Sequence, residues 1–260
     1  MCRHLAYLGP PVTLASLVLD PPHALVRQSY APREMVPRTL INADGFGVGW
    51  YSATRAEPAR YRRAQPIWTD ASFASFAGVV SSGAVLAAVR SATPGFPVEE
   101  SGAAPFTSGR WLFSLNGFLA DWARAAAALR DLLPDGAAAT VESPSDAALM
   151  WAVLRHRLES GTPLVDAVRA LWQDAVDAGG GRLNLLATDG RVAVATTYGN
   201  SLHALTRGAA TLVASEPLDD DPAWTRVPDA SLVVASAGEI SVDSLQSPAA
   251  EPALSRRSTQ

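Results

Sequence analysis

The sequence predicts an α+β domain in which sheets and helices form separate layers. Short apolar runs that are typical of strands occupy both ends of the chain, and the long helical patterns are grouped between residues 119 and 178. A parallel βαβ fold would instead alternate strands and helices along the chain. The 260 residues suffice for one domain with a sizeable core. We expect a single domain over residues 2–245 and a disordered tail, rich in Pro, Ala, Ser and Arg, over residues 246–260.

The first half of the chain contains four predicted strands and two predicted helices. In order, they are a strand at 1–8 that ends at Gly9-Pro10-Pro11, a helix at 13–19, a strand at 42–51, a helix at 70–82, a strand at 85–89 and a strand at 111–114. A loop rich in proline and arginine separates the first helix from the second strand. In that second strand, glycines at every other position indicate the close approach of another backbone or of a ligand.

The second half contains three predicted helices followed by strands. The helices cover 119–133, 144–158 and 163–178, and the second begins at Ser143-Pro144-Ser145-Asp146, which we interpret as an N-cap with proline at the first helical position. Strands at 183–188 and 192–197 flank Asp189-Gly190, which is typical of a two-residue hairpin turn. Further strands are predicted near 200–205, 211–215, 231–235 and 238–242.

Charge and composition exclude several classes of protein. The formal net charge is −4 without a basic cluster, which argues against nucleic-acid binding. All 21 basic residues are arginine, so Schiff-base and P-loop lysine chemistry is excluded. The single cysteine and four scattered histidines exclude internal disulfides and predict no metal site. GFGVGW lacks the third glycine of a dinucleotide-binding loop, so we expect no cofactor.

The sequence also carries no membrane or export signal. No run approaches the roughly 18 apolar residues that a membrane helix needs, and the N-terminus lacks a basic region followed by an apolar run. We therefore expect a cytoplasmic enzyme with a small-molecule substrate, and the sequence does not indicate its oligomeric state.

Cys2 is the residue that points most clearly to catalysis. Most unpaired cysteines are small buried hydrophobic residues, and that interpretation remains open. Its position, however, allows Cys2 to become the first residue once Met1 is removed. The free α-amine, with a reference pKa of about 7.7–8.0, then acts as general base for the thiol of the same residue.

Three further features match this chemistry, although each also has an ordinary structural explanation. Arg90 follows an apolar strand, where it is either a surface residue or a binding residue whose planar guanidinium holds a carboxylate through two N–H groups. Asn116-Gly117 either forms an ordinary turn or supplies two hydrogen-bond donors, the Asn amide and the Gly N–H, to an oxyanion. Asp146 either counters a helix dipole or pairs with an ammonium group.

Together, in this order, these residues resemble the class II glutamine amidotransferases, which are N-terminal-nucleophile hydrolases. The resemblance implies a four-layer αββα fold with two stacked, mainly antiparallel sheets between helical layers. It also implies that the thiolate of Cys2 attacks a γ-glutamyl carbonyl while Asn116 and Gly117 stabilise the oxyanion. Arg90 would hold the glutamyl α-carboxylate, Asp146 the α-amino group, and Thr93 would contribute to the same pocket.

Blocks such as MCRHLAYLG, NADGFGVGWY and ASEPLDDDPAW are similar to the subgroup of this family that serves ergothioneine biosynthesis. The resemblance implies hydrolysis of a γ-glutamyl precursor without a synthetase domain. Charge alone offers Glu216 or its neighbours as candidates to face the cationic end of that precursor. Two alternatives remain: a glutaminase subunit that supplies ammonia to a separate partner, and a scaffold that binds glutamyl groups without catalysis.

Two residues complicate this assignment. The family commonly has His before Asn-Gly, whereas this chain has Leu115. If the α-amine is the base, Leu115 is a packing change beneath the oxyanion loop. His4 lies two residues after Cys2 and, in a strand, shares its face, so it is a partner of the thiol, a structural histidine or a histidine that contacts the substrate.

Overall fold

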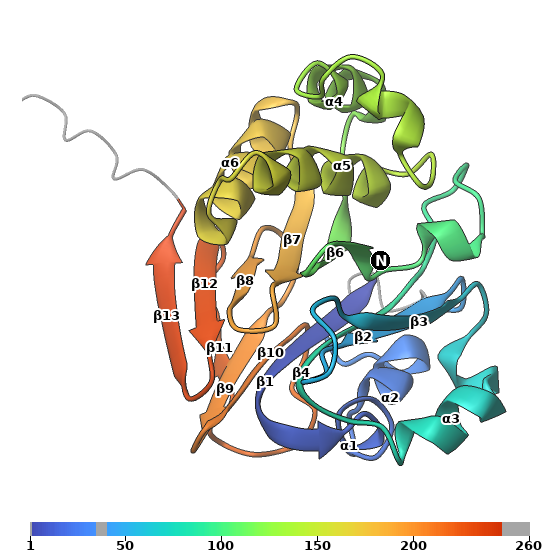
Figure 1. The fold of residues 1–260 in the computed structure, drawn as a ribbon, viewed down its shortest axis with the longest axis vertical. Helices are drawn as coiled ribbons and strands as arrows, with labels where there is room; N and C mark the ends of the chain where they lie inside the picture. The colour runs from blue at the N-terminus through green and yellow to red at the C-terminus, as the bar shows by residue number, and fades with distance from the viewer. Residues whose placement is uncertain (1, 35–40, 246–260) are drawn as a thin grey trace, which may run out of the picture.

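Two stacked antiparallel sheets form the centre of the protein in the computed structural model, which describes residues 2–34 and 41–245 (Figure 1). Within these residues the first sheet, in spatial order, consists of β11 (Thr225–Arg226), β9 (His203–Arg207), β10 (Ala210–Ala214), β1 (Arg3–Thr13), β4 (Ser81–Val89), β2 (Phe46–Trp50) and β3 (Ala59–Arg63). The second sheet consists of β13 (Glu239–Ser244), β12 (Ser231–Ser236), β8 (Ala193–Thr196), β7 (Gly181–Thr188), β6 (Trp111–Leu119) and β5 (Phe106–Ser108). Met1 and the expected tail at 246–260 lie outside the described residues.

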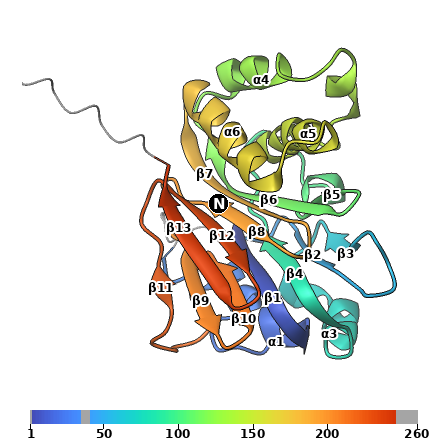
Figure 2. The ribbon, with the colours of Figure 1, turned by 60° about the vertical axis from the view of Figure 1, so that its left-hand side comes forward.

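Helices cover the outer face of each sheet (Figure 2). The first sheet packs against α1 (Ala15–Val18), α2 (Leu25–Tyr30) and α3 (Ala71–Ala77). The second sheet packs against α4 (Trp122–Arg130), α5 (Asp146–Glu159) and α6 (Leu164–Asp177). A third apolar cluster fills the space between the sheets. The order helix, sheet, sheet, helix confirms the α+β class and the αββα layers that the resemblance implied.

Local sequence explains where the helices on the second sheet begin and end. The Ser145 side chain caps α5 by accepting from the Ala148 N–H, and the Asp121 side chain caps α4 in the same way. In α6 the apolar residues recur every three or four positions, which gives the helix one buried face. After α6 the backbone turns at Gly180, whose φ of 68° favours glycine.

Glycines of β2 allow the second sheet to approach the first closely. Gly47 and Gly49 of β2 lie where a Cβ would collide with Ala104 O and with the Leu112 side chain. The expected close approach at these alternating glycines is therefore confirmed, and the approaching groups belong to the 103–112 segment of the second sheet. This contact brings the end of the first sheet near the loop that becomes part of the site.

Several predicted boundaries in the first half were wrong. The first strand continues through Gly9-Pro10-Pro11 to Thr13, with a register shift between Leu8 and Val12 that accommodates the prolines. Helix α2 lies in the region predicted as a loop, and β3 was not predicted. The helix predicted at 70–82 ends at Ala77, because Ser81 already pairs in β4.

Further boundaries were wrong in the second half. The strand predicted at 111–114 extends to Leu119 because it pairs with β7 along its whole length, so Asn116-Gly117 is not a turn. Helix α5 has Ser145 as its N-cap, which places Pro144 before the helix rather than at its first position. The hairpin between β7 and β8 has a four-residue connection, since Thr188 pairs with Ala193.

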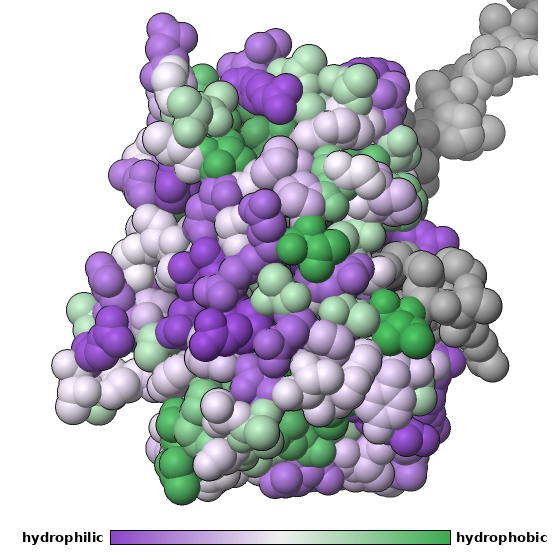
Figure 3. Space-filling view, turned by 90° about the vertical axis from the view of Figure 1, so that its right-hand side faces the viewer, coloured by the Kyte–Doolittle hydropathy of each residue, from purple (hydrophilic) through white to green (hydrophobic). Residues whose placement is uncertain are grey.

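Charged residues protect the exposed edge at β3 of the first sheet. Arg62 and Arg60 pair with Glu142 at 2.9 and 3.9 Å, and Arg63 pairs with Glu100 at 3.4 Å. Figure 3 shows the right-hand side of Figure 1, where a hydrophilic band lies between more hydrophobic groups. In the described part of the chain, no helix is both long and apolar enough to cross a membrane.

Candidate active site

The candidate site lies where strand ends from both sheets meet. Cys2 immediately precedes β1 and Arg90 immediately follows β4, and the antiparallel pairing of Arg3 with Val89 makes Cys2 and Arg90 neighbours. Strand β6 of the second sheet and the beginning of α5 supply the opposite wall. Half-buried Cys2 and the other predicted residues Arg90, Thr93, Gly117 and Asp146 line one cleft of about 490 Å³. Sequence reasoning missed other lining residues, among them Phe96, Gly102 and Ser145.

Backbone contacts hold the buried Arg90 side chain in the cleft wall. Its Nη2 donates to Pro97 O at 2.9 Å and its Nη1 to Glu99 O at 3.5 Å. Within the described residues it makes no ion pair, so its charge remains available to an anionic ligand. Gly102 packs directly against it, because a Cβ at Gly102 would lie 2.8 Å from Nη1. The arginine is thus oriented by groups that do not neutralise it.

Asp146 presents a carboxylate at the opposite wall. It is the first residue of α5 and is buried; its Oδ1 accepts from the Ala147 N–H at 2.8 Å and its Oδ2 from the Leu119 N–H at 3.4 Å. Burial raises the pKa of Asp146, while these N–H groups and the nearby Arg90 charge oppose the increase. Among the described residues Asp146 makes no ion pair, and a buried carboxylate of this kind gains energy when it pairs with an ammonium group.

Gly117 contributes a backbone donor to the cleft. A Cβ there would collide with the carbonyl of Arg182 on β7, so this position requires glycine. The N–H groups of alternate residues in a strand point to the same edge. Since the Leu119 N–H donates to Asp146, the Gly117 N–H also points away from β7, toward the cleft edge.

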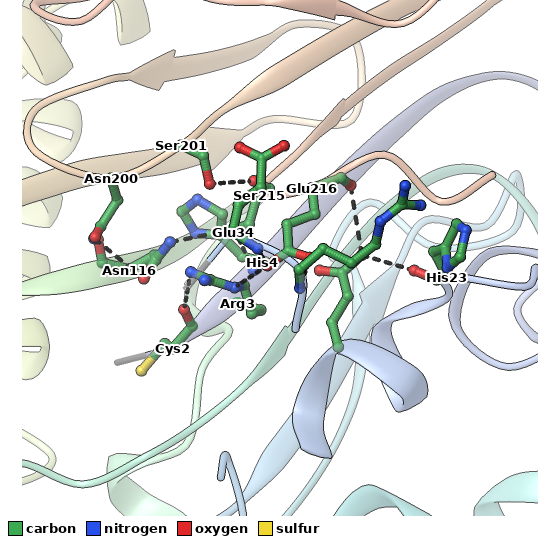
Figure 4. A network of polar contacts seen from close by, with 12 residues as sticks. Cys2, Arg3, His4, His23, Glu34, Asn116, Asn200, Ser201, Ser215 and Glu216 are labelled. Carbon is green, nitrogen blue, oxygen red and sulfur yellow. Dashed lines mark hydrogen bonds and ion pairs between the residues drawn. The ribbon is translucent and has the colours of Figure 1, made fainter. Parts of the chain in front are cut away.

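Asn116 is the one predicted residue that does not belong to the described cleft lining. It is fully buried, and its Nδ2 donates to Ser215 Oγ at 3.2 Å. Asn200 donates through its Nδ2 to the backbone carbonyl of Asn116 at 2.9 Å. The amide therefore lies within a buried polar network (Figure 4). Nothing in the sequence indicated that Ser215 and Asn200 would fix its orientation.

His4 and Leu115 occupy structural positions. His4 is completely buried, and burial, together with the Arg3 charge, lowers its pKa to about 3. Its Nδ1 lies 3.2 Å from Ser114 Oγ. A histidine that remains neutral at pH 7 cannot form a thiolate–imidazolium pair with Cys2. Leu115 packs into the core beneath the helices of the second sheet and touches the cleft with its remaining surface.

A buried ion pair lies beside Cys2, which sequence reasoning missed. Arg3 Nε is 3.0 Å from Glu216 Oε1, and both side chains are 1% exposed. Arg3 also donates through Nη1 to the carbonyl of Cys2 at 3.3 Å (Figure 4). Glu216 thus faces Arg3 instead of a substrate cation. The two residues are 213 positions apart, and only the β1–β10 pairing, in which Leu5 faces Ala214, brings them together.

The cleft offers a thiol, an unneutralised guanidinium, a buried carboxylate and a backbone N–H in one place. The opposite charges at Arg90 and Asp146 match the α-carboxylate and α-ammonium groups of a glutamyl residue. Among the residues that the structure describes, no group of three His, Cys, Asp or Glu side chains is placed to hold a metal ion.

The chain is similar over most of its length to curated γ-glutamyl-hercynylcysteine sulfoxide hydrolases. It is 46% identical over 234 residues to the protein of that name from Mycolicibacterium smegmatis, covering 90% of this chain and 95% of the relative. The Mycobacterium tuberculosis protein is 45% identical, with 90% and 92% covered. A probable glutamine amidotransferase from Saccharomyces cerevisiae is 30% identical over 47% of this chain and 36% of its own length. No protein-family profile matches the chain.

Solved structures share the fold. A glutamine aminotransferase class-II domain protein from Silicibacter pomeroyi superposes with a TM-score of 0.66 at 23% identity, covering 95% of this chain and all of that one. Glutamine phosphoribosylpyrophosphate amidotransferase from Bacillus subtilis gives a TM-score of 0.65 at 14% identity, covering 94% of this chain and 49% of that one. At these identities the likeness concerns the fold alone.

Proposed function

The chain belongs to the γ-glutamyl-hercynylcysteine sulfoxide hydrolase family, and from this premise we propose that it hydrolyses the γ-glutamyl amide of γ-glutamyl-hercynylcysteine sulfoxide. The products are glutamate and hercynylcysteine sulfoxide, and the latter is an intermediate of ergothioneine biosynthesis. The observation that carries the proposal is the cleft that Cys2, Arg90 and Asp146 line together. A cysteine nucleophile and two opposite charges are what cleavage of a zwitterionic γ-glutamyl group requires.

Binding of the glutamyl group uses the two walls of the cleft. The α-carboxylate docks on the guanidinium of Arg90, and the α-ammonium docks on the carboxylate of Asp146, with Thr93 beside the first contact. These contacts orient the γ-carbonyl toward Cys2, and orientation of this kind supplies a large part of the rate in covalent catalysis.

Attack on the amide requires the free N-terminus of Cys2, which removal of Met1 exposes. The α-amine accepts the thiol proton, and the thiolate forms a bond to the γ-carbonyl carbon. The Gly117 N–H, with the amide of Asn116, stabilises the oxyanion. The C–N bond then breaks as the ammonium group returns its proton to the leaving nitrogen, which leaves a glutamyl thioester on Cys2.

Hydrolysis of the thioester restores the enzyme. The same α-amine accepts a proton from water, the hydroxide adds to the thioester carbonyl, and the C–S bond breaks to release glutamate and the thiolate. His4 does not take part in either step, because its neutral, buried imidazole is directed at Ser114.

A substrate comparison tests the proposed activity. The purified protein should release glutamate from γ-glutamyl-hercynylcysteine sulfoxide with a kcat/KM at least about tenfold higher than that for glutamine, a difference of about 1.4 kcal/mol. The Cys2→Ala variant serves as the inactive control. A preference for glutamine, with ammonia as product, would instead show that the chain is a glutaminase subunit.

A blocked N-terminus tests the role of the α-amine. An extension that cannot be cleaved from Cys2 should abolish turnover, whereas the same extension with a protease site directly before Cys2 should restore full activity after cleavage. Full activity with the extension in place would exclude the α-amine as base and would leave the substrate assignment intact.

A further inference from the structure

We propose that the buried ion pair of Arg3 and Glu216 positions Cys2 for attack, and that its role is to fix the nucleophile rather than to stabilise the fold. This inference rests on the proposed function, because it assigns a task to residues beside the proposed nucleophile. Neither residue lines the cleft, so the pair acts only through Cys2.

The nucleophile needs such a contact because it lies at a chain end. Once Met1 is removed, Cys2 has one covalent neighbour, and it precedes the first residue that pairs in β1. Terminal residues are poorly ordered unless other groups hold them. Among the described residues, the hydrogen bond that reaches Cys2 comes from Arg3, whose Nη1 donates to its carbonyl at 3.3 Å.

Glu216 makes this arginine rigid. Its Oε1 lies 3.0 Å from Arg3 Nε and also accepts the Glu34 N–H at 3.1 Å, while its Oε2 accepts the Arg33 N–H at 2.7 Å. The carboxylate is completely buried, and Glu216 lies two residues after the end of β10, which pairs with β1. Cys2 is therefore connected through one guanidinium to a carboxylate that two consecutive backbone N–H groups, those of Arg33 and Glu34, hold in place.

The energetics favour a positional role over a purely stabilising one. Moving an ion pair out of water costs about as much as the pair gains, and apolar residues of similar volume often give equal or greater stability. A fold that required only stability at this position would thus not need two charges. In contrast, a displacement of about 1 Å at a reacting group can reduce the rate about 100-fold.

The main experiment removes both charges together. The double variant Arg3→Met, Glu216→Gln retains apolar volume and an amide oxygen for one backbone N–H, and it leaves no unpaired buried charge. We expect a Tm close to that of the parent, a kcat reduced about 100-fold and a KM within about threefold of the parent value. The control is Arg157→Met, Asp174→Asn, which removes the 2.5 Å pair between α5 and α6 and should leave kcat unchanged.

A second variant and a labelling assay keep the test independent of folding and of substrate choice. Arg3→Lys retains the charge but loses the fork that reaches both Glu216 and Cys2, so kcat should fall about tenfold. In both Arg3 variants a diazo-ketone glutamine analogue should label Cys2 more slowly, in proportion to kcat, while iodoacetamide should label the thiol at the parent rate.

The outcomes separate this inference from the proposed function. A folded double variant with a kcat within threefold of the parent, or with its loss in KM alone, would overturn the positional role. If the parent does not hydrolyse the sulfoxide substrate, the proposed function fails, and the labelling rates still report whether the pair positions Cys2.

Discussion

Two sets of one arginine and one carboxylate lie near Cys2, and they differ in whether the two charged groups form an ion pair. On one side, Arg90 and Asp146 line the same cleft without forming an ion pair, and backbone groups hold each of them. On the other side, Arg3 and Glu216 are joined at 3.0 Å and exclude solvent. The same two kinds of charged group are therefore kept apart in the proposed glutamyl-binding site and joined in the pair that we propose positions Cys2.

The difference shows that the surroundings of a charged residue determine its role more than its type does. Arg90 donates to the neutral carbonyls of Pro97 and Glu99, which orient the guanidinium and leave its charge for a ligand. Arg3 meets a carboxylate, so its charge is already compensated. This comparison predicts that changes on the cleft side act mainly on substrate binding, whereas changes on the buried side act on the rate of the chemical step.

Among changes to the two arginine–carboxylate pairs, the largest effect is expected for Arg90→Met. Removing one partner of a buried charge pair costs about 2–5 kcal/mol, so kcat/KM for the γ-glutamyl substrate should fall about a thousandfold, mainly through KM. Steady-state kinetics measures this change. Arg63→Met is the matched control and should retain full activity. Arg63 is an exposed arginine on the edge strand β3, and it pairs with Glu100. Parent-like KM in Arg90→Met would exclude Arg90 from substrate binding.

Asp146→Asn should separate binding from stability. Burial raises the pKa of Asp146 in the folded protein, so the ionised carboxylate lowers the free energy of unfolding at neutral pH. This loss of stability disappears as pH falls below the raised pKa. The neutral amide should therefore leave Tm unchanged or higher at pH 7, while KM rises about 100-fold. In the parent, kcat/KM should fall on the acid side at a pH above the ordinary aspartate range.

The control for this prediction is Asp166→Asn, an exposed aspartate in the first turn of α6. It removes the same charge from an equivalent helical position outside the cleft, and KM should not change. A loss of Tm in Asp146→Asn together with an unchanged KM would assign Asp146 a structural role only.

Gly102→Ala should weaken the cleft side without removing a charged group. The added Cβ would lie 2.8–2.9 Å from the guanidinium atoms of Arg90, so the arginine must move. We expect kcat/KM to fall about tenfold through KM, as for a misplaced binding group. Gly78→Ala, where a Cβ would have no contact closer than 3.9 Å, should be neutral. Equal kinetics for both variants would show that the position of Arg90 is not critical.

The smallest effect on activity is expected at Leu115. Leu115→His places a polar group in the apolar core beneath α4 and α5, which should reduce the free energy of unfolding by about 1–3 kcal/mol without increasing kcat. Urea unfolding and steady-state kinetics measure the two quantities, and Leu115→Met, a volume-conserving change, is the control. A higher kcat in Leu115→His would show that a base is missing at this position.

Local sequence patterns predicted the layers and the cleft wall better than the boundaries and the buried network. The order of Cys2, Arg90, Asn116-Gly117 and Asp146 was readable because each lies in or next to an apolar strand or at the beginning of a helix. Strand β3, with three arginines in five residues, carries no apolar pattern and was missed for that reason. The helix α2 was missed because prolines on both sides obscure its six residues.

The Arg3–Glu216 pair illustrates what sequence reasoning lacks. The contact depends on the pairing of β1 with β10, which joins the two ends of the chain. No spacing rule connects positions 3 and 216, and charge alone suggested a substrate contact for Glu216. Long-range pairing of this kind becomes visible only in three dimensions.

The most direct test of the account is the mass of the protein before and after reaction with a γ-glutamyl diazo-ketone. The account predicts a mass that lacks Met1 and a gain of one adduct, located on Cys2 by peptide mapping, which appears in step with the loss of hydrolysis. An adduct on another residue, or full hydrolysis by protein that retains Met1, would contradict it.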